Sequence, residues 1–195
     1  MYAYPGANDL LKLTEEAIAY ASRARYLHFS SFVGDYGLEA QRALLAKQRL
    51  SFAPGMLYAR ERCLVELKEL ISASEVIFLN RDEAFHLTGN EYERRAEMLL
   101  DMGAKMVVVT LGEEGCVIAS GSGRIRVPAL KTKVVDTTGA GDAFATGFLY
   151  GLPKGYDLET CRKLGNFVAA RCIAKVGARA GLPTKREVEE FLEGL

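Results

Sequence analysis

The chain has 195 residues, which is enough for one ordinary domain with a sizeable core. Its 25 basic and 25 acidic residues balance, so no charge bias predicts binding to nucleic acid or to an anionic membrane surface. No apolar run approaches about 18 residues, so no membrane span is predicted. The N-terminus lacks the basic flank and apolar segment of a signal peptide.

The cysteines and histidines are scattered and show no metal-ligand spacing. Neither histidine, His28 or His86, has a cysteine nearby, so each is expected to be a satisfied or surface side chain. We expect the cysteines to be reduced thiols of a cytoplasmic protein. They are Cys63, Cys116, Cys161 and Cys172.

The first half of the chain alternates predicted helices with predicted strands. Helices are expected over 14–22, 38–47, 61–71, 82–88 and 91–102. Strands are expected over 26–29, 50–52, 76–79 and 106–110, and the first and last of these are expected to be buried. The last is a continuous apolar run, typical of a parallel strand. This alternation predicts an α/β fold with a doubly wound, Rossmann-like, mostly parallel sheet flanked by helices. No linker or repeat interrupts it, so a single domain over 1–195 is expected.

The second half begins with a predicted hairpin, with strands over 116–119 and 124–127. Residues 133–135 are expected to end a further strand, and a buried helix is expected to follow residues 136–142. Two more helices are expected over 158–175 and 185–192. Ligands of such sheets bind outside the carboxyl ends of the strands, so the residues that follow strands are the candidates for chemistry.

The stretch Asp-Thr-Thr-Gly-Ala-Gly-Asp at 136–142 is the strongest of these candidates. Gly139 and Gly141 lack a Cβ, so the backbone can approach a ligand closely. The first amides of the following helix would form an anion site. Asp142 at the mouth of that site is suited to take a proton from a hydroxyl that attacks a phosphoryl group. The alternative is that Asp142 only caps the helix.

The nine-residue run at 136–144, Asp-Thr-Thr-Gly-Ala-Gly-Asp-Ala-Phe, resembles the signature of the PfkB/ribokinase family of carbohydrate and nucleoside kinases. The resemblance extends over nearly the whole chain. It implies a ribokinase-like fold and ATP-dependent transfer of the γ-phosphoryl group to a hydroxyl of a sugar or nucleoside. It also implies that Asp142 is the catalytic base and that Gly139, Ala140 and Gly141 form the anion hole. A nucleotide-binding chain without turnover, a fragment or subunit that needs an N-terminal partner, is the alternative.

Asn80 and Glu83 follow the strand predicted over 76–79. Asn-x-x-Glu at this point resembles the metal and phosphate motif of the same family. The resemblance implies that Glu83 helps to hold Mg²⁺, which takes few protein carboxylates, and that Asn80 contacts phosphate or metal-bound water. The alternative is that the two side chains cap the following helix.

The sequence Thr-x-Gly-x-x-Gly follows the strand predicted over 106–110. In the family this segment lines the ATP site, which implies that role for Thr110, Gly112 and Gly115. A tight turn into the hairpin would explain the two glycines equally well.

The loop over 176–184 contains small residues and a proline, and a plain connector is one reading of it. In many relatives the matching loop encloses adenine and joins the first Asp of the signature in binding a monovalent cation such as K⁺. Asp136 is the side chain that this resemblance assigns to the ion. Asn166 matches a position near the adenine, with a surface residue as the alternative.

Relatives are longer at the N-terminus, where they carry the first strands of the sheet, a β lid and most sugar-binding side chains. Ala53 also stands where relatives commonly have Asp. A sheet without those strands would expose unpaired edges. Association is therefore expected, as a homo-oligomer or with a separate N-terminal chain.

Overall fold

The structure is a computed structural model that describes residues 6, 12–45, 49–89 and 92–195. Two compact units make up the chain. The first unit comprises residues 1–109 and 118–125, and the second comprises residues 110–117 and 126–195. Each unit is described by itself below, and a single domain over 1–195 stays a prediction.

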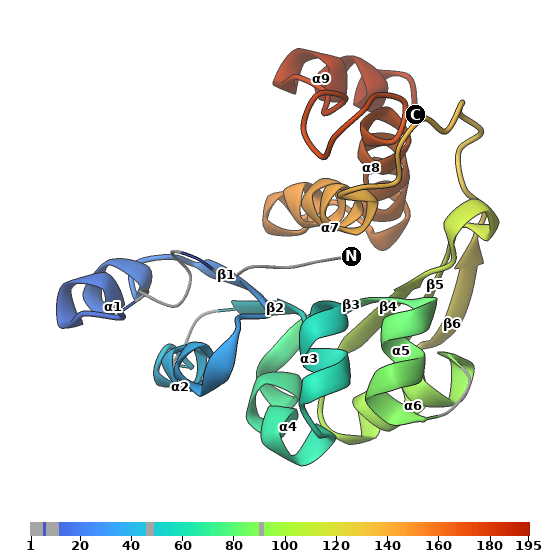
Figure 1. The fold of residues 1–195 in the computed structure, drawn as a ribbon. Helices are drawn as coiled ribbons and strands as arrows, with labels where there is room; N and C mark the ends of the chain where they lie inside the picture. The colour runs from blue at the N-terminus through green and yellow to red at the C-terminus, as the bar shows by residue number, and fades with distance from the viewer. Residues whose placement is uncertain (1–5, 7–11, 46–48, 90–91) are drawn as a thin grey trace. The chain divides into compact units, whose positions relative to one another are not determined.

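The sheet has six strands in the order β1-β2-β3-β4-β5-β6 (Figure 1). Strands β1 and β2 pair in parallel, as do β2 and β3, which confirms the predicted α/β class. The bounds are β1 (Tyr26–Ser30), β2 (Arg49–Ala53), β3 (Ser74–Asn80), β4 (Met106–Thr110), β5 (Cys116–Ser120) and β6 (Gly123–Val127).

Strands β3 and β4 in the middle of the sheet are buried, whereas most of the edge strand β1 is not. Residues 76–79 of β3 and 107–109 of β4 are at most 5% exposed, as their continuous apolar sequences predict. In β1 only Phe29 is buried. The expectation of a buried strand over 26–29 was therefore wrong for its first three residues, because β1 lies at one edge of the described sheet.

Six helices belong to the first unit, and Figure 1 shows α2 to α6 on the same side of the sheet. Right-handed crossovers between sequential parallel strands place their helices in this way. The bounds are α1 (Glu15–Ala21), α2 (Gly34–Ala43), α3 (Gly55–Glu61), α4 (Leu64–Ala73), α5 (Arg81–Thr88) and α6 (Tyr92–Asp101).

Two predicted helices in this unit differ from the structure. Helix α2 begins four residues before the predicted start at 38, and residues 46–47 of the prediction lie outside the described residues. The helix predicted over 61–71 is instead α4, preceded by the separate helix α3. The break falls at Arg62 and Cys63, because Cys63 and Glu66 cap the start of α4 reciprocally.

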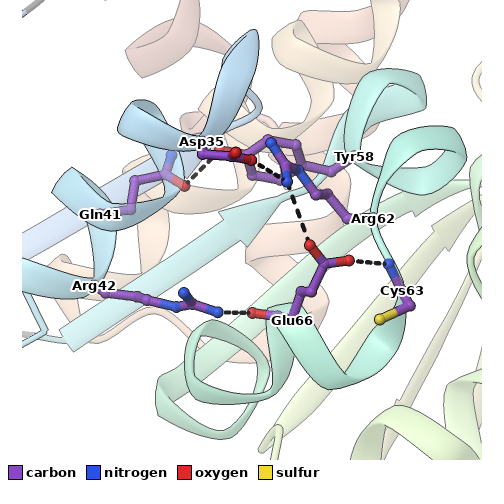
Figure 2. A network of polar contacts seen from close by, with 7 residues as sticks. All are labelled: Asp35, Gln41, Arg42, Tyr58, Arg62, Cys63 and Glu66. Carbon is purple, nitrogen blue, oxygen red and sulfur yellow. Dashed lines mark hydrogen bonds and ion pairs between the residues drawn. The ribbon is translucent and has the colours of Figure 1, made fainter.

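A polar network ties α2, α3 and α4 together (Figure 2). The buried Tyr58 hydroxyl of α3 donates to Gln41 Oε1 of α2 at 3.2 Å, and burial raises the pKa of Tyr58. Arg62 bridges Asp35 of α2, at 2.5 Å, and Glu66 of α4, at 3.3 Å. These contacts fix the three helices relative to one another.

The second unit is built around α7 (Ala140–Gly151), α8 (Leu158–Cys172) and α9 (Lys185–Glu193), with short 3-10 turns η2 (Gly112–Glu114) and η3 (Leu152–Lys154). Helices α7 and α8 pack closely because glycines lie between them. A Cβ on Gly147 would lie 2.5 Å from the Leu164 carbonyl oxygen. Phe191 of α9 stacks on Phe167 of α8, with ring centroids 4.2 Å apart. The buried helix predicted to follow residues 136–142 is confirmed, although it begins within that stretch, at Ala140.

The strand end predicted at residues 133–135 was wrong. No strand is assigned there, and Val134 and Val135 are both exposed. The amides of Val135 and Asp136 donate to the carbonyl oxygen of Ile173, at 2.8 and 3.2 Å. The apolar run therefore pairs with the end of a helix rather than with a neighbouring strand.

Within the described ranges, no helix is both long enough and apolar enough to cross a membrane.

Candidate active site

The turn before α7 requires, at residue 139, a backbone conformation that favours glycine. Gly139 is the N-cap of α7 and has a φ of 77°, in the left-handed region. A Cβ on Gly139 would also lie 2.6 Å from the Cβ of Ala178. The signature turn, residues 136–142, and the loop over 176–184 therefore approach each other at this glycine.

Three amides of this turn have no acceptor among the described residues. These are the N–H groups of Gly139, Gly141 and Asp142. The Ala140 amide differs, because it donates to the Thr137 carbonyl oxygen at 3.1 Å. A Cβ on Gly141 would meet nothing within 4 Å. Unengaged donors at the start of a 12-residue helix make a site suited to an anion.

Asp142, whose amide is one of these three, is the third residue of α7 and carries a carboxylate. It is exposed, and no hydrogen bond or ion pair joins it to another described side chain or amide. The alternative that Asp142 only caps the helix was wrong, because the N-cap is Gly139 and no side chain caps α7. An unengaged carboxylate next to an anion site can accept a proton from a bound hydroxyl.

Asp136 joins the signature turn to the loop over 176–184. Its Oδ1 accepts from the Thr138 amide at 2.9 Å, and its Oδ2 accepts from the Gly177 amide at 2.8 Å. The Thr138 hydrogen bond and then the Gly177 hydrogen bond lower the pKa of Asp136. The carboxylate is therefore held in its charged form and directs the two segments toward each other.

Asn80 and Glu83 form a reciprocal capping box at the start of α5. The Glu83 amide donates to Asn80 Oδ1 and the Asn80 amide donates to Glu83 Oε2, both at 2.8 Å. This confirms the capping alternative as a local arrangement. A carboxylate oxygen accepts more than one partner, so the cap is compatible with a contact to a metal ion or its water.

The turn after β4 uses its two glycines differently. The Leu111 amide donates to the Gly115 carbonyl oxygen at 2.7 Å, which closes the turn directly after Thr110. A Cβ on Gly115 would lie 1.8 Å from the Val127 carbonyl oxygen, whereas one on Gly112 would meet nothing within 4 Å. Packing against the backbone therefore explains Gly115, and only Gly112 leaves open space for a ligand.

Asn166 is buried, at 9% exposure, and its Nδ2 donates to the Pro128 carbonyl oxygen at 2.9 Å. The alternative of a surface residue was therefore wrong. A Cβ on Gly115 would approach the same Pro128 backbone, at 2.7 Å. Asn166 and Gly115 thus meet at the segment that leaves β6.

The site residues predicted from the sequence lie in three separate parts of the fold. Asp136 and residues 139–142 share the signature turn; Thr110, Gly112, Gly115 and Asn166 surround the turn after β4 and the segment that leaves β6. Asn80 and Glu83 belong to the first unit. The described residues contain no group of three or more His, Cys, Asp or Glu side chains placed to hold a metal.

Sequence reasoning missed one residue that contacts the signature turn. Cys172 is fully buried at the end of α8, and its Sγ lies 3.7 Å from the Thr138 carbonyl oxygen and 3.4 Å from that of Ala178. No spacing in the sequence connects it with the turn, and its only signal was a cysteine at the end of an amphipathic helix.

Comparison with known proteins identifies the family. A family model described as pfkB family carbohydrate kinase matches residues 1–185. The chain belongs to the pfkB family.

Relatives of this pfkB family chain carry the names of several kinases. An uncharacterized sugar kinase of Archaeoglobus fulgidus is 44% identical over 183 residues, which are 92% of this chain and 73% of the relative. A cytidine kinase of Thermococcus kodakarensis is 44% identical over 124 residues, 62% of this chain and 44% of the relative. The alternative of a chain without turnover finds no support in these names.

A solved structure confirms the ribokinase-like fold. The ribokinase of Thermotoga maritima superimposes with a TM-score of 0.82 and 27% identity, over 97% of this chain and 64% of that chain. The pfkB chain thus spans about two thirds of the ribokinase and less than half of the cytidine kinase.

Proposed function

We propose that the protein is an ATP-dependent phosphotransferase that moves the γ-phosphoryl group to a hydroxyl of a sugar or nucleoside. One observation carries the proposal. Three amides without an acceptor among the described residues lie at the start of α7, and the first turn of the same helix carries Asp142, whose carboxylate is unengaged. A phosphoryl transfer needs both parts, namely donors for the developing charge and a base for the hydroxyl proton.

In the proposed reaction, the acceptor oxygen forms a bond to the γ-phosphorus while the bond from that phosphorus to its bridging oxygen breaks. Asp142 accepts the proton of the acceptor hydroxyl. The amides of Gly139 and Gly141, together with the Asp142 amide, donate to the phosphoryl oxygens. Their preorganised position means that little rearrangement is needed as charge develops.

The remaining residues of the proposal hold the nucleotide and the ions. Thr110, Gly112 and Asn166 would line the ATP site, and Gly115 would close the turn that carries Gly112. Glu83 would help to hold Mg²⁺, and Asn80 would contact phosphate or metal-bound water. Asp136 would contribute to a monovalent cation site. Bound Mg²⁺ would neutralise part of the phosphate charge. Asp136 and Glu83 are carboxylates already held by backbone amides, so their orientation is fixed in advance.

The acceptor is proposed only as a class, because the relatives include both a sugar kinase and a cytidine kinase. We also propose a cytoplasmic location, since the four cysteines are free thiols and three of them are buried. Association with a second copy or with an N-terminal chain stays a prediction.

The experiment is a coupled assay of ADP formation with ATP, Mg²⁺ and a panel of sugars and nucleosides. Asp142→Asn should lower kcat roughly 100-fold or more, because the amide cannot accept the proton. Asp101→Asn, which changes an exposed aspartate at the end of α6, is the control and should keep full activity. Wild-type turnover in the Asp142→Asn variant would refute the assignment of the base.

A further inference from the structure

The signature turn is held by a set of contacts from the end of α8 and the loop that follows. The Ile173 carbonyl oxygen accepts from the amides of Val135 and Asp136, and Asp136 in turn accepts from Gly177. These contacts fix the chain entering the turn. They leave open what holds the carbonyl oxygen of Thr138, which belongs to the same peptide group as the unengaged amide of Gly139.

Cys172 is placed to hold that part. Its Sγ is within hydrogen-bonding distance of two carbonyl oxygens, at 3.7 Å from Thr138 and 3.4 Å from Ala178. Thr138 precedes Gly139 in the turn, and Ala178 is the residue that a Cβ on Gly139 would strike. One thiol therefore contacts both segments at their point of closest approach.

The thiol is available as a donor at neutral pH. Cys172 is fully buried, and burial raises its pKa. The charges of Asp136 and Asp142 raise the pKa further. A protonated thiol can donate its hydrogen to either carbonyl oxygen, whereas a thiolate would repel both.

We propose that Cys172 is a positioning residue for phosphoryl transfer, which sets the direction of the Gly139, Gly141 and Asp142 amides by holding the carbonyls of Thr138 and Ala178. It touches no reacting atom and acts through the turn. This inference rests on the proposed function for its catalytic part, while the placement of the amides is independent of any activity.

The same helix offers a matched control. Cys161 of α8 is also fully buried, and its Sγ lies 3.6 Å from the carbonyl oxygen of Tyr156. It packs near Gly151, the last residue of α7, whereas Cys172 lies near the residues that precede α7. Replacement of either cysteine by alanine removes the same atom from the same helix, but only one of the two changes concerns the signature turn.

The test combines kinetics with amide resonances of the uniformly ¹⁵N-labelled chain. Cys172→Ala should shift the amide resonances of Gly139, Gly141 and Asp142 and lower kcat about tenfold, since small displacements of catalytic groups are costly. The KM values should change less than about twofold, because the effect is on the transition state. Cys161→Ala should leave these resonances and kcat as in the wild type.

Cys172→Ser keeps a donor and should restore most of the lost kcat. The inference would be overturned if Cys172→Ala and Cys161→Ala had the same kcat and the same amide resonances for Gly139, Gly141 and Asp142. It would also be overturned if Cys172→Ser restored none of the lost kcat. If the wild type has no turnover with any acceptor, the proposed function fails, but the amide resonances still decide whether Cys172 positions the turn. If Cys172→Ala does not fold, the amide resonances of Gly139, Gly141 and Asp142 in Cys172→Ser are the test. Chemical shifts close to those of the wild type support the donor role of Cys172, and changed chemical shifts overturn it.

Discussion

The signature turn and the start of α5 both carry the residue types of a phosphate or metal site, but their polar groups are used differently. In the signature turn, three amides and the carboxylate of Asp142 have no partner among the described residues. At the start of α5, Asn80 and Glu83 satisfy each other's backbone amides. The first site is open to a ligand, whereas the second would have to share its side chains with one.

This difference teaches how to weigh a motif against local structure. A motif whose polar atoms are already paired within the chain has a sufficient structural explanation, and a ligand role needs additional support. A motif whose donors remain unpaired keeps them available to a ligand, because the first amides of a helix have no partner within it. The functional assignment is accordingly stronger for residues 139–142 than for Asn80 and Glu83.

Of the three predictions that follow, the largest effect on activity is expected at Gly139, which tests whether the unengaged amides of the signature turn must keep their direction. Gly139→Ala should lower kcat on the order of 100-fold, because its Cβ would strike Ala178 and displace the amides. Gly155→Ala is the matched control. Gly155 has nearly the same φ, 76°, but nothing lies within 4 Å of its added Cβ. Equal loss of activity in both variants would show that strain, and not the position of the turn, is responsible.

A smaller effect is expected at Glu83, where one substitution distinguishes a helix-capping role of the side chain from a metal-binding role. Gln at position 83 can still accept from the Asn80 amide, so Glu83→Gln should keep the melting temperature of the wild type. The Mg²⁺ concentration for half-maximal activity should rise about tenfold if the carboxylate helps to hold the ion.

The control for this variant is Glu187→Gln, which changes the equivalent carboxylate of the capping box at the start of α9. It should leave the Mg²⁺ dependence unchanged. An unchanged Mg²⁺ dependence in Glu83→Gln as well would reduce Asn80 and Glu83 to a helix cap.

The smallest effect concerns Asp136 and the pH dependence of stability. Its pKa is lowered in the folded protein, so its stabilisation is complete above the ordinary aspartate value of about 3.9. That stabilisation is lost as the pH falls through the lower, folded value. Asp136→Asn should therefore lower the melting temperature at pH 7, because an amide nitrogen cannot accept from a backbone N–H. The gap from the wild type should shrink below about pH 4.

Asp101→Asn is the control for this pH dependence. Asp101 is an exposed aspartate at the end of α6 and is distant in sequence from the signature turn. The melting temperature of this variant should follow that of the wild type at every pH. A constant gap between wild type and Asp136→Asn down to pH 3 would contradict the role of the Asp136 charge.

Much of the fold could be predicted because its signals are local. The apolar runs of β3 and β4 and the capping box at Asn80 and Glu83 depend on residues within one element or one turn. Local signals gave a wrong prediction where a residue distant in sequence determines the backbone conformation. Residues 133–135 have the composition of a strand, but the carbonyl oxygen of Ile173 accepts two amides in and just after this run.

The candidate site was predictable in composition but not in arrangement. The glycines and aspartates of residues 136–142 stand next to one another in the sequence, so their chemistry could be inferred directly. The amide of Ala140 was expected to serve the anion hole, yet it donates to Thr137. The contact of Cys172 with Thr138 and Ala178 depends on how α8 ends beside the turn, which no periodicity reveals.

The contacts that hold the signature turn have a consequence for the order in which the chain is built. Cys172 is 34 residues beyond Thr138, and Gly177 is 41 residues beyond Asp136. A ribosome therefore releases the turn well before it releases the residues that shape it. The turn acquires its final backbone only when α8 and the loop that follows it have been made, so a nascent chain that still lacks them cannot yet engage a phosphate.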